Sequence, residues 1–272
     1  MTRLANDRWG KSAVRVSKIH RGDGKDEFSD VTVRIVLEGD VETAYTDGEN
    51  AHVLPTDTMR NTVYALAQDH LTSDLEKFGS VLVDRFLEPD FIDRATVELA
   101  EQRWERFGPV AFVGGSSERR TARVDGTRTS RVIYAGLEGL VVLKTSGSAF
   151  TGYPKDEYTL LAETDDRILA TSVAAEWRYD QAPGDTTSTW ETVRSLLIEH
   201  FFDDWSASVQ RQGWLMAGAV LEGVDVIGEI TLNLPNQHHL TFDLARLGLE
   251  DRGIVFHPVS EPFGDISLTV TR

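Results

Sequence analysis

Three polar residues in the first quarter of the chain could serve a reactive site, one as a base and two at a helix start that attracts anions. Lys11 lies just before the first strand-like stretch, and its amine could act as a base if its pKa were lowered. Thr56 and Asp57 precede an apolar periodic segment, where a helix start would leave main-chain N–H groups unpaired. By position alone, a solvated lysine and two helix-capping side chains are the simpler interpretation.

A second group of residues could hold a flat anion. Arg167 begins a strand-like run and could offer its planar guanidinium to two acceptor atoms at once, although two adjacent aspartates favour an ordinary surface ion pair. Val209 and Gln210 lie where a loop enters a helix, so unpaired N–H groups and an amide side chain are available there. Phe150, in a glycine-rich loop, could stack on a ring or anchor the loop over the core.

Asn236 and His238 are two residues apart, so both side chains face the same way if the segment is extended. Gln237 and His239 would then face the opposite way, which argues against His238 and His239 as a metal-binding pair. The other five histidines show no zinc-type spacing, and the chain contains no cysteine. The sequence therefore gives no support for a metal site.

Charge and composition limit the class of protein. The 272 residues are 40% hydrophobic and carry a net charge of -16, which disfavours nucleic acid and anionic membranes as partners. The amino-terminal residues lack an apolar signal, no run is long enough to span a membrane, and the chain does not end in Ser-Lys-Leu. We expect a soluble, cytoplasmic protein with roughly two domains or one duplicated unit.

Strand-like and helix-like stretches follow one another in an order that occurs twice. The first series has strands at 13–20 and 28–38, helices at 58–70 and 73–87, and strands at 95–107 and 119–124. Thr56 or Asp57 is the expected cap of the first helix and Ser73 that of the second, and the stretch 95–107 is also compatible with a helix. The second series has strands at 131–145 and 167–179, helices at 188–203 and 208–223, and strands at 224–234 and 238–244.

This order predicts an α+β protein with two ββααββ units, residues 1–129 and 130–272, each an antiparallel sheet with a helix pair on one face. Such sheets leave open edges, and association of subunits into a closed barrel is one way to cover them. We therefore expect oligomerisation.

Four short motifs also follow one another along the chain. They are Trp-Gly-Lys at 9–11, Thr-Asp-Thr-Met-Arg-Asn-Thr at 56–62, the block 150–179 with Asp-Arg-Ile-Leu at 166–169, and Asn-Gln-His-His at 236–239. The set resembles the urate oxidase (uricase) family over nearly the whole chain. Trp9, Arg60 and Gln237 depart from the residues that are usual in this family, but none is an assigned site residue.

The resemblance implies a role for each candidate residue. Lys11, Thr56 and His238 would form a proton-relay group. Arg167 and Gln210 would hold the edge of the purine, and Phe150 would stack on its face. The main-chain N–H groups of Asp57 and Val209 would bind its oxygens or nitrogens. Asn236 would help to position oxygen or water above the ring, near Thr56. Thr56 and Asp57 would reach a site built mainly by a neighbouring subunit, so monomers would be inactive.

The resemblance further implies a tandem T-fold and a homotetramer with active sites at subunit interfaces. The reaction would be oxidation of urate by O2 and water to 5-hydroxyisourate and hydrogen peroxide, without flavin or metal. Two alternatives are a T-fold pterin enzyme, which should show zinc ligands that this sequence lacks, and a purine-binding homologue without turnover.

Overall fold

The computed structural model describes residues 2–203, 205–250 and 252–272. The chain divides into two compact units, which we call unit 1 (Met1–Gly136 and Trp177–Trp190) and unit 2 (Leu137–Glu176 and Glu191–Arg272). The strands β7 (Arg131–Lys144) and β8 (Leu169–Tyr179) and the helix α4 (Thr186–Asp203) contribute residues to both units. The expected T-fold boundary after residue 129 stays a prediction.

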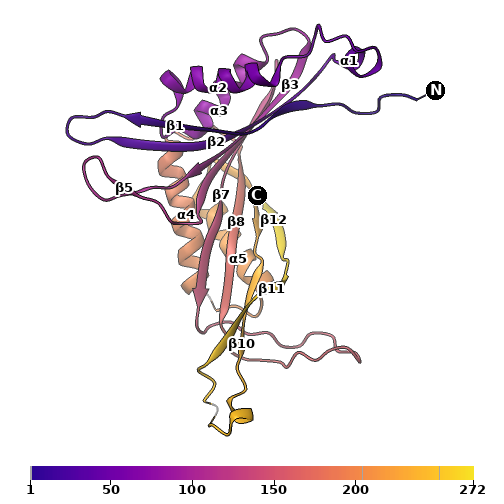
Figure 1. Ribbon diagram of the computed structural model, residues 1–272. Helices are drawn as coiled ribbons and strands as arrows, with labels where there is room; N and C mark the ends of the chain where they lie inside the picture. The colour runs from indigo at the N-terminus through magenta and orange to yellow at the C-terminus, as the bar shows by residue number, and fades with distance from the viewer. Residues whose placement is uncertain (1, 204, 251) are drawn as a thin grey trace. The chain divides into compact units, whose positions relative to one another are not determined.

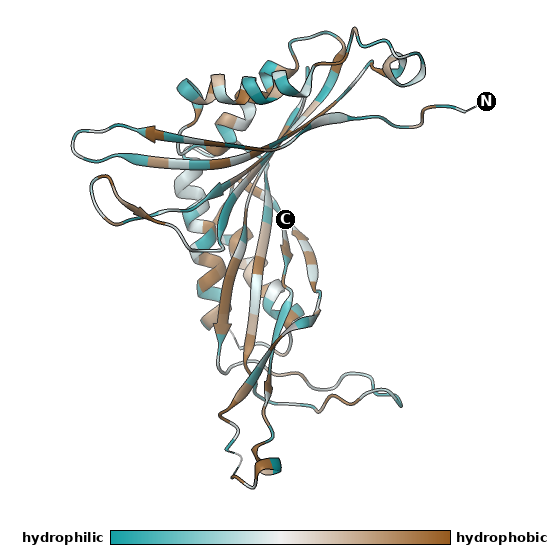
Figure 2. Cartoon of the chain, in the orientation of Figure 1, coloured by the Kyte–Doolittle hydropathy of each residue, from teal (hydrophilic) through white to brown (hydrophobic). Residues whose placement is uncertain are grey.

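Unit 1 contains an antiparallel sheet. Its strands are hydrogen-bonded in the order β1 (Trp9–His20), β2 (Glu27–Gly39), β3 (Ile92–Gln102) and β6 (Arg119–Thr127). From Val31 to Leu37 of β2 every second residue is apolar and fully buried, and Figure 2 shows polar and apolar residues alternating on this strand. The hairpin is thus confirmed, and the helical alternative for 95–107 is wrong because the same alternation continues through β3.

Helices α2 (Thr56–His70) and α3 (Leu75–Phe86) cover one face of this sheet (Figure 1). In α2 the buried residues Met59, Val63 and Ala67 recur every four positions, which gives the helix a single apolar stripe. Gly79 of α3 lies so close to the sheet that a Cβ atom would stand 2.9 Å from side-chain carbons of Leu99 and Val124. The stretch predicted as one strand, 95–107, contains the end of β3 and a separate short strand, β4 (Glu105–Arg106). The sequence did not predict α1 (Glu42–Thr46) or β5 (Phe112–Val113).

The starts of both helices differ from the predicted caps. Helix α2 begins at Thr56 after Pro55, which makes no side-chain cap bond, so neither Thr56 nor Asp57 is the cap. The Asp57 carboxylate instead pairs with Arg60, one turn further on. Helix α3 is capped by Asp74, whose Oδ1 accepts a hydrogen bond from the Lys77 N–H at 2.9 Å, one residue after the predicted Ser73.

Unit 2 is built on the remainder of β7 and β8. The strand β8 pairs with β10 (Asn236–Thr241) and with β9 (Ile227–Asn233). These two strands pair in turn with β11 (Phe256–Gly264) and β12 (Ser267–Thr271), and a 3-10 turn (Leu244–Leu247) lies between β10 and β11. Helix α5 (Val209–Gly223) packs on β9 and β12.

Strands β11 and β12 were not predicted from the sequence. Pro258 and Pro262 interrupt β11, and proline removes a ladder donor, so the pattern did not indicate a strand. The alternation in β12 was short but readable. Within the described part of the chain, no helix combines the length and the apolar character needed to cross a membrane.

The cap of α3 gives a direct test of this fold. Replacing Asp74 with Ala removes the acceptor for the Lys77 N–H and should lower the free energy of unfolding by about 1 kcal/mol. Replacing Ser73 with Ala should change it by less than about 0.5 kcal/mol, since the hydrogen bonds that Ser73 accepts from Arg120 and Thr187 go to its main-chain oxygen, which the substitution keeps. Urea unfolding of the two variants, followed by circular dichroism, makes the comparison. Equal losses would contradict the assigned cap.

Candidate functional site

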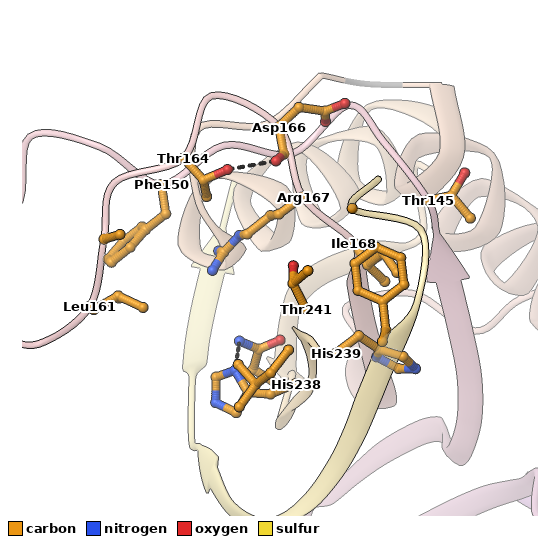
Figure 3. Close-up of a pocket in the computed structure, with 15 residues that line it drawn as sticks. Thr145, Phe150, Leu161, Thr164, Asp166, Arg167, Ile168, His238, His239 and Thr241 are labelled. Carbon is orange, nitrogen blue, oxygen red and sulfur yellow. Dashed lines mark hydrogen bonds between the residues drawn. The ribbon is translucent and has the colours of Figure 1, made fainter. Parts of the chain in front are cut away.

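A pocket of about 470 Å³ lies within unit 2, between the ends of its strands (Figure 3). Three segments line it: the loop after β7, the residues leading into β8, and the β10–β11 hairpin. Its lining includes four of the predicted site residues, Phe150, Arg167, Asn236 and His238. The structure therefore brings together residues that are up to 88 positions apart in the sequence.

Main-chain hydrogen bonds at Ser148 connect the segments that carry these residues. The Arg167 N–H donates to Ser148 O at 2.8 Å, which fixes the entry of β8 against the loop. On either side of Ser148, the Ala149 N–H donates to Ser206 O at 2.8 Å, and the Ser206 N–H donates to Gly147 O at 3.0 Å. Ser148 and Ser206 are both fully buried. The loop to Phe150, the start of β8 and the segment before α5 are thus joined at one point.

Arg167 makes no ion pair with another described residue. Its guanidinium carbon lies 5.1 Å from the centre of the Phe150 ring, and its buried Nε has no hydrogen-bond partner in the described part of the chain. Burial lowers the pKa of this guanidinium, yet arginine keeps its charge in proteins. Asp165 and Asp166 were the expected ion-pair partners, but Asp166 instead accepts hydrogen bonds from the Gly147 and Ser148 N–H groups at 2.7 and 3.4 Å. Arg167 is therefore available to an anion.

Phe150 is held by its own loop. Its ring stacks on Tyr153 at 4.7 Å between centroids, with 16° between the planes. The Tyr153 hydroxyl donates to Leu161 O at 2.6 Å, and Phe150 exchanges two main-chain hydrogen bonds with Thr164. An aromatic ring fixed in this way loses little further freedom when it packs against a flat ligand.

Asn236 and His238 lie at the start of β10. Asn236 is 8% exposed and pairs with Thr171 of β8, and its Nδ2 is 3.3 Å from His238 Nδ1. The Asn236 Nδ2 is a donor, so His238 Nδ1 accepts and a neutral ring carries its proton on Nε2. Figure 3 shows this hydrogen bond with Arg167 extending from the other wall of the pocket.

Strict alternation does not hold in β10, because its pairing register shifts between Asn236 and His238. His239 also lines the pocket, but its Nδ1 faces Gln237 O at 3.1 Å. Among the described residues, no group of three or more His, Cys, Asp or Glu side chains is arranged to hold a metal ion.

Val209 and Gln210 do not line this pocket. They form the first turn of α5 after Ser208, whose hydroxyl accepts from the Arg211 N–H at 3.1 Å. Val209 is buried and Gln210 is exposed. Their link to the site is the hydrogen-bonded contact of Ser206 with the 147–149 loop.

Lys11, Thr56 and Asp57 all belong to unit 1. The Trp9 indole N–H donates to Leu54 O at 3.1 Å, which ties the start of β1 to the segment before α2. Lys11 is half-buried and stands at the edge of a β-bulge, where Ala13 has a φ of 56°. Thr56 and Asp57 are exposed at the first turn of α2. These three residues thus form a separate group on neighbouring elements of unit 1.

Sequence reasoning missed several residues that shape the pocket in unit 2. The sequence indicated Asp166 only as an ion-pair partner, although an aspartate near a glycine-rich loop is a common acceptor for main-chain N–H groups. Thr241 and Phe256 line the pocket from the β10–β11 hairpin. They could not be placed there because β11 was not predicted.

Comparison with known proteins places the chain in a family. A family model described as Uricase matches residues 7–127 and 133–267. The chain is 39% identical to the uricase of Arthrobacter globiformis over 99% of this chain and 90% of the relative, and 36% identical to that of Aspergillus flavus over 100% and 98%.

Solved structures agree with this assignment. The crystal structure of the Arthrobacter globiformis uricase superposes with a TM-score of 0.96 at 39% identity, covering 100% of this chain and 96% of the other. A uricase from Bacillus fastidious, at 24% identity and a TM-score of 0.83, covers 98% and 94% and supports the fold alone. These structural matches confirm the expected α+β tandem T-fold. The chain therefore belongs to the uricase family and is an oxidoreductase of the urate oxidase type.

Proposed function

We propose that this enzyme oxidises urate with O2 and water to 5-hydroxyisourate and hydrogen peroxide, without flavin or metal. The observation that carries the proposal is Arg167, a partly buried cation with no ion-pair partner among the described residues, beside the ring of Phe150. Leaving a buried cation unpaired is costly unless an anion fills the place. A flat, electron-rich monoanion such as urate matches both the charge and the adjacent ring.

Substrate binding would use the residues of unit 2. Arg167 would hold one edge of urate with two N–H groups, and Phe150 would stack on the ring. The Val209 N–H and the Gln210 amide would hydrogen-bond the other edge, which requires the first turn of α5 to face the ligand. The junction at Ser148 supports this arrangement, since it ties α5 to the loop of Phe150.

Proton transfer would use Lys11 and Thr56 together with His238. Removal of a further proton from urate makes the ring electron-rich enough to give an electron to O2, which needs a base and a relay. A lysine and a threonine on adjoining elements can pass a proton between them, and the Asp57 N–H at the helix start would bind a ring atom. Asn236 would position O2, and later water, above the ring, with His238 Nε2 serving the hydroxylation step.

The reaction itself can be tested without further structure. Urate absorbance, oxygen uptake and peroxide should be followed together in enzyme treated with a strong chelator. We expect urate loss and peroxide formation to match despite the chelator. Urate binding without oxygen uptake would indicate a binding-only homologue, and absence of binding would remove the pocket assignment.

Replacing Lys11 or Thr56 with Ala should lower kcat by about a hundredfold or more, while the urate dissociation constant changes by less than about fivefold. The reason is that the relay acts on the proton and not on the bound ring. Lys25→Ala, which removes a charge of the same sign at the exposed turn of the β1–β2 hairpin, is the matched control and should keep full turnover. Steady-state kinetics will give kcat, and separate binding measurements will give the urate dissociation constant. An unchanged kcat in both variants would remove the relay assignment.

We also propose that Thr56 and Asp57 complete the site of a neighbouring subunit within a homotetramer. Thr56→Ala impairs the residues that unit 1 contributes, and Arg167→Gln impairs the pocket of unit 2. Each variant alone should therefore have little activity. When the two are co-expressed, sites with neither substitution can form only if the groups come from different subunits. Recovery of activity to at least a tenth of normal is therefore expected; activity no higher than that of either variant would show that one subunit supplies both groups.

A further inference from the structure

Two side chains at the start of β1 face the helices of unit 1. Trp9 pairs with Leu37 of β2, and Lys11 pairs with Ile35. Residues directly opposite each other in an antiparallel pair lie on the same face of the sheet. Leu37 and Ile35 are fully buried in a core that also contains residues of α2 and α3. Trp9 and Lys11 are therefore directed toward the helix-covered face, where α2 packs on β1 (Figure 1).

The main chain on both sides of Lys11 has little freedom. At Gly10 a Cβ atom would stand 2.0 Å from Ile35 O, so β1 approaches β2 more closely than a side chain would allow. After Lys11 the pairing register shifts, and Ala13 has a φ of 56°. A bulge of this kind re-aims the side chains beside it. The direction of the Lys11 side chain is thus set by the main chain at the start of β1.

The Trp9 side chain joins this part of β1 to the residues that lead into α2. Its indole N–H donates to Leu54 O at 3.1 Å, and both side chains pack against the core of unit 1. Among the described residues, no other hydrogen bond connects β1 with residues 50–56. Leu54 precedes Thr56 by two residues, as Trp9 precedes Lys11 by two. One hydrogen bond thus connects the two short pieces of chain that lead to Lys11 and to Thr56.

A second anchor holds the segment 50–56 to a different part of unit 1. The His52 ring stacks on Phe91 at 5.1 Å between centroids, with 4° between the planes, and its Nδ1 is 3.1 Å from Asp40 O. Asp40 and Phe91 are neighbours, since the Asp40 N–H donates to Phe91 O at 2.9 Å. This anchor does not involve β1. Loss of the Trp9 N–H should therefore shift the segment relative to β1 without detaching it from the unit.

We propose that Trp9 is a positioning residue for the proton relay: its N–H holds the segment before α2 where the Thr56 hydroxyl can exchange a proton with the Lys11 amine. This inference rests on the proposed function, in which Lys11 and Thr56 pass the proton. Trp9 acts only through the main chain at Leu54. Proton transfer needs hydrogen-bond reach, and a displacement of about 1 Å can cost about a hundredfold in rate. Loss of the Trp9 N–H should thus slow proton transfer and leave urate bound.

The test separates the indole N–H from the bulk of the ring. Benzothienylalanine, introduced at position 9 by amber suppression, has the shape of tryptophan with sulfur in place of the N–H. It should lower kcat by about tenfold or more and change the urate dissociation constant by less than about fivefold. The solvent isotope effect on kcat should rise, because proton transfer then limits the rate. Trp9→Phe, which also lacks the N–H, should lower kcat at least as much.

Tyr64→Phe is the matched control. The Tyr64 hydroxyl of α2 donates to Arg15 O of β1 at 3.0 Å, so this variant also loses one side-chain hydrogen bond to a main-chain oxygen. Arg15 lies beyond the bulge, and Tyr64 lies eight residues after Thr56. The variant should therefore keep the kcat and the isotope effect of the unmodified enzyme.

Hydrogen exchange of residues 53–62, followed by mass spectrometry, reports on the segment without reference to turnover. The Val53 and Met59 N–H groups are hydrogen-bonded there, to Asn50 O and Pro55 O. We expect faster exchange with benzothienylalanine at position 9 than in the unmodified enzyme or in Tyr64→Phe.

Three results would overturn the proposal: unchanged exchange, a kcat that benzothienylalanine leaves unchanged while Lys11→Ala is inactive, or an equal loss of kcat in Tyr64→Phe. Failure of the proposed function looks different. Absence of urate turnover in the unmodified enzyme, or full turnover in Lys11→Ala, would contradict the relay itself, and the exchange measurement would still decide whether Trp9 holds the segment.

Discussion

The candidate site in unit 2 depends on main-chain hydrogen bonds at Ser148 and its neighbours. Through this residue and its neighbours, the loop that carries Phe150, the strand entry that carries Arg167 and the segment before α5 are held together. The bonds are buried, where main-chain groups without partners would be strongly unfavourable. Asp166 adds a carboxylate acceptor to the same loop. A substitution that displaced this junction would move the Phe150 ring, the Arg167 guanidinium and the start of α5 together.

The electrostatics of the chain explain why one unpaired arginine matters. With a net charge of -16, the surface as a whole does not attract an anionic substrate. Selectivity for an anion must then come from a local cation that the protein does not neutralise. Arg167 has this property because the adjacent acidic residue is bound to main-chain N–H groups and is not free to pair with it.

Much of the fold could be read from the sequence, because strand alternation in β2 and β3 and the four-residue spacing in α2 are strong local signals. What could not be read depends on partners distant in sequence. The caps of α2 and α3 were each misplaced, and β11 was missed because its prolines hide the pattern. In the candidate site, the residue types were found by family motifs, whereas the bond between Asp166 and the 147–148 amides follows only from the folded loop.

The base of the 150–164 loop, where Phe150 pairs with Thr164 and which we call its neck, determines where the length of this loop can change. Phe150 and Thr164 exchange main-chain hydrogen bonds at 2.8 and 3.1 Å, so the residues between them leave and return at one fixed place. At the tip, Tyr158 is 82% exposed and Leu160 95% exposed, and they carry little of the packing. Insertions and deletions at such a tip are tolerated because they do not alter the geometry at the neck. The tip is therefore a region where related sequences can vary in length, and where a peptide tag could be grafted, while the ring of Phe150 keeps its position.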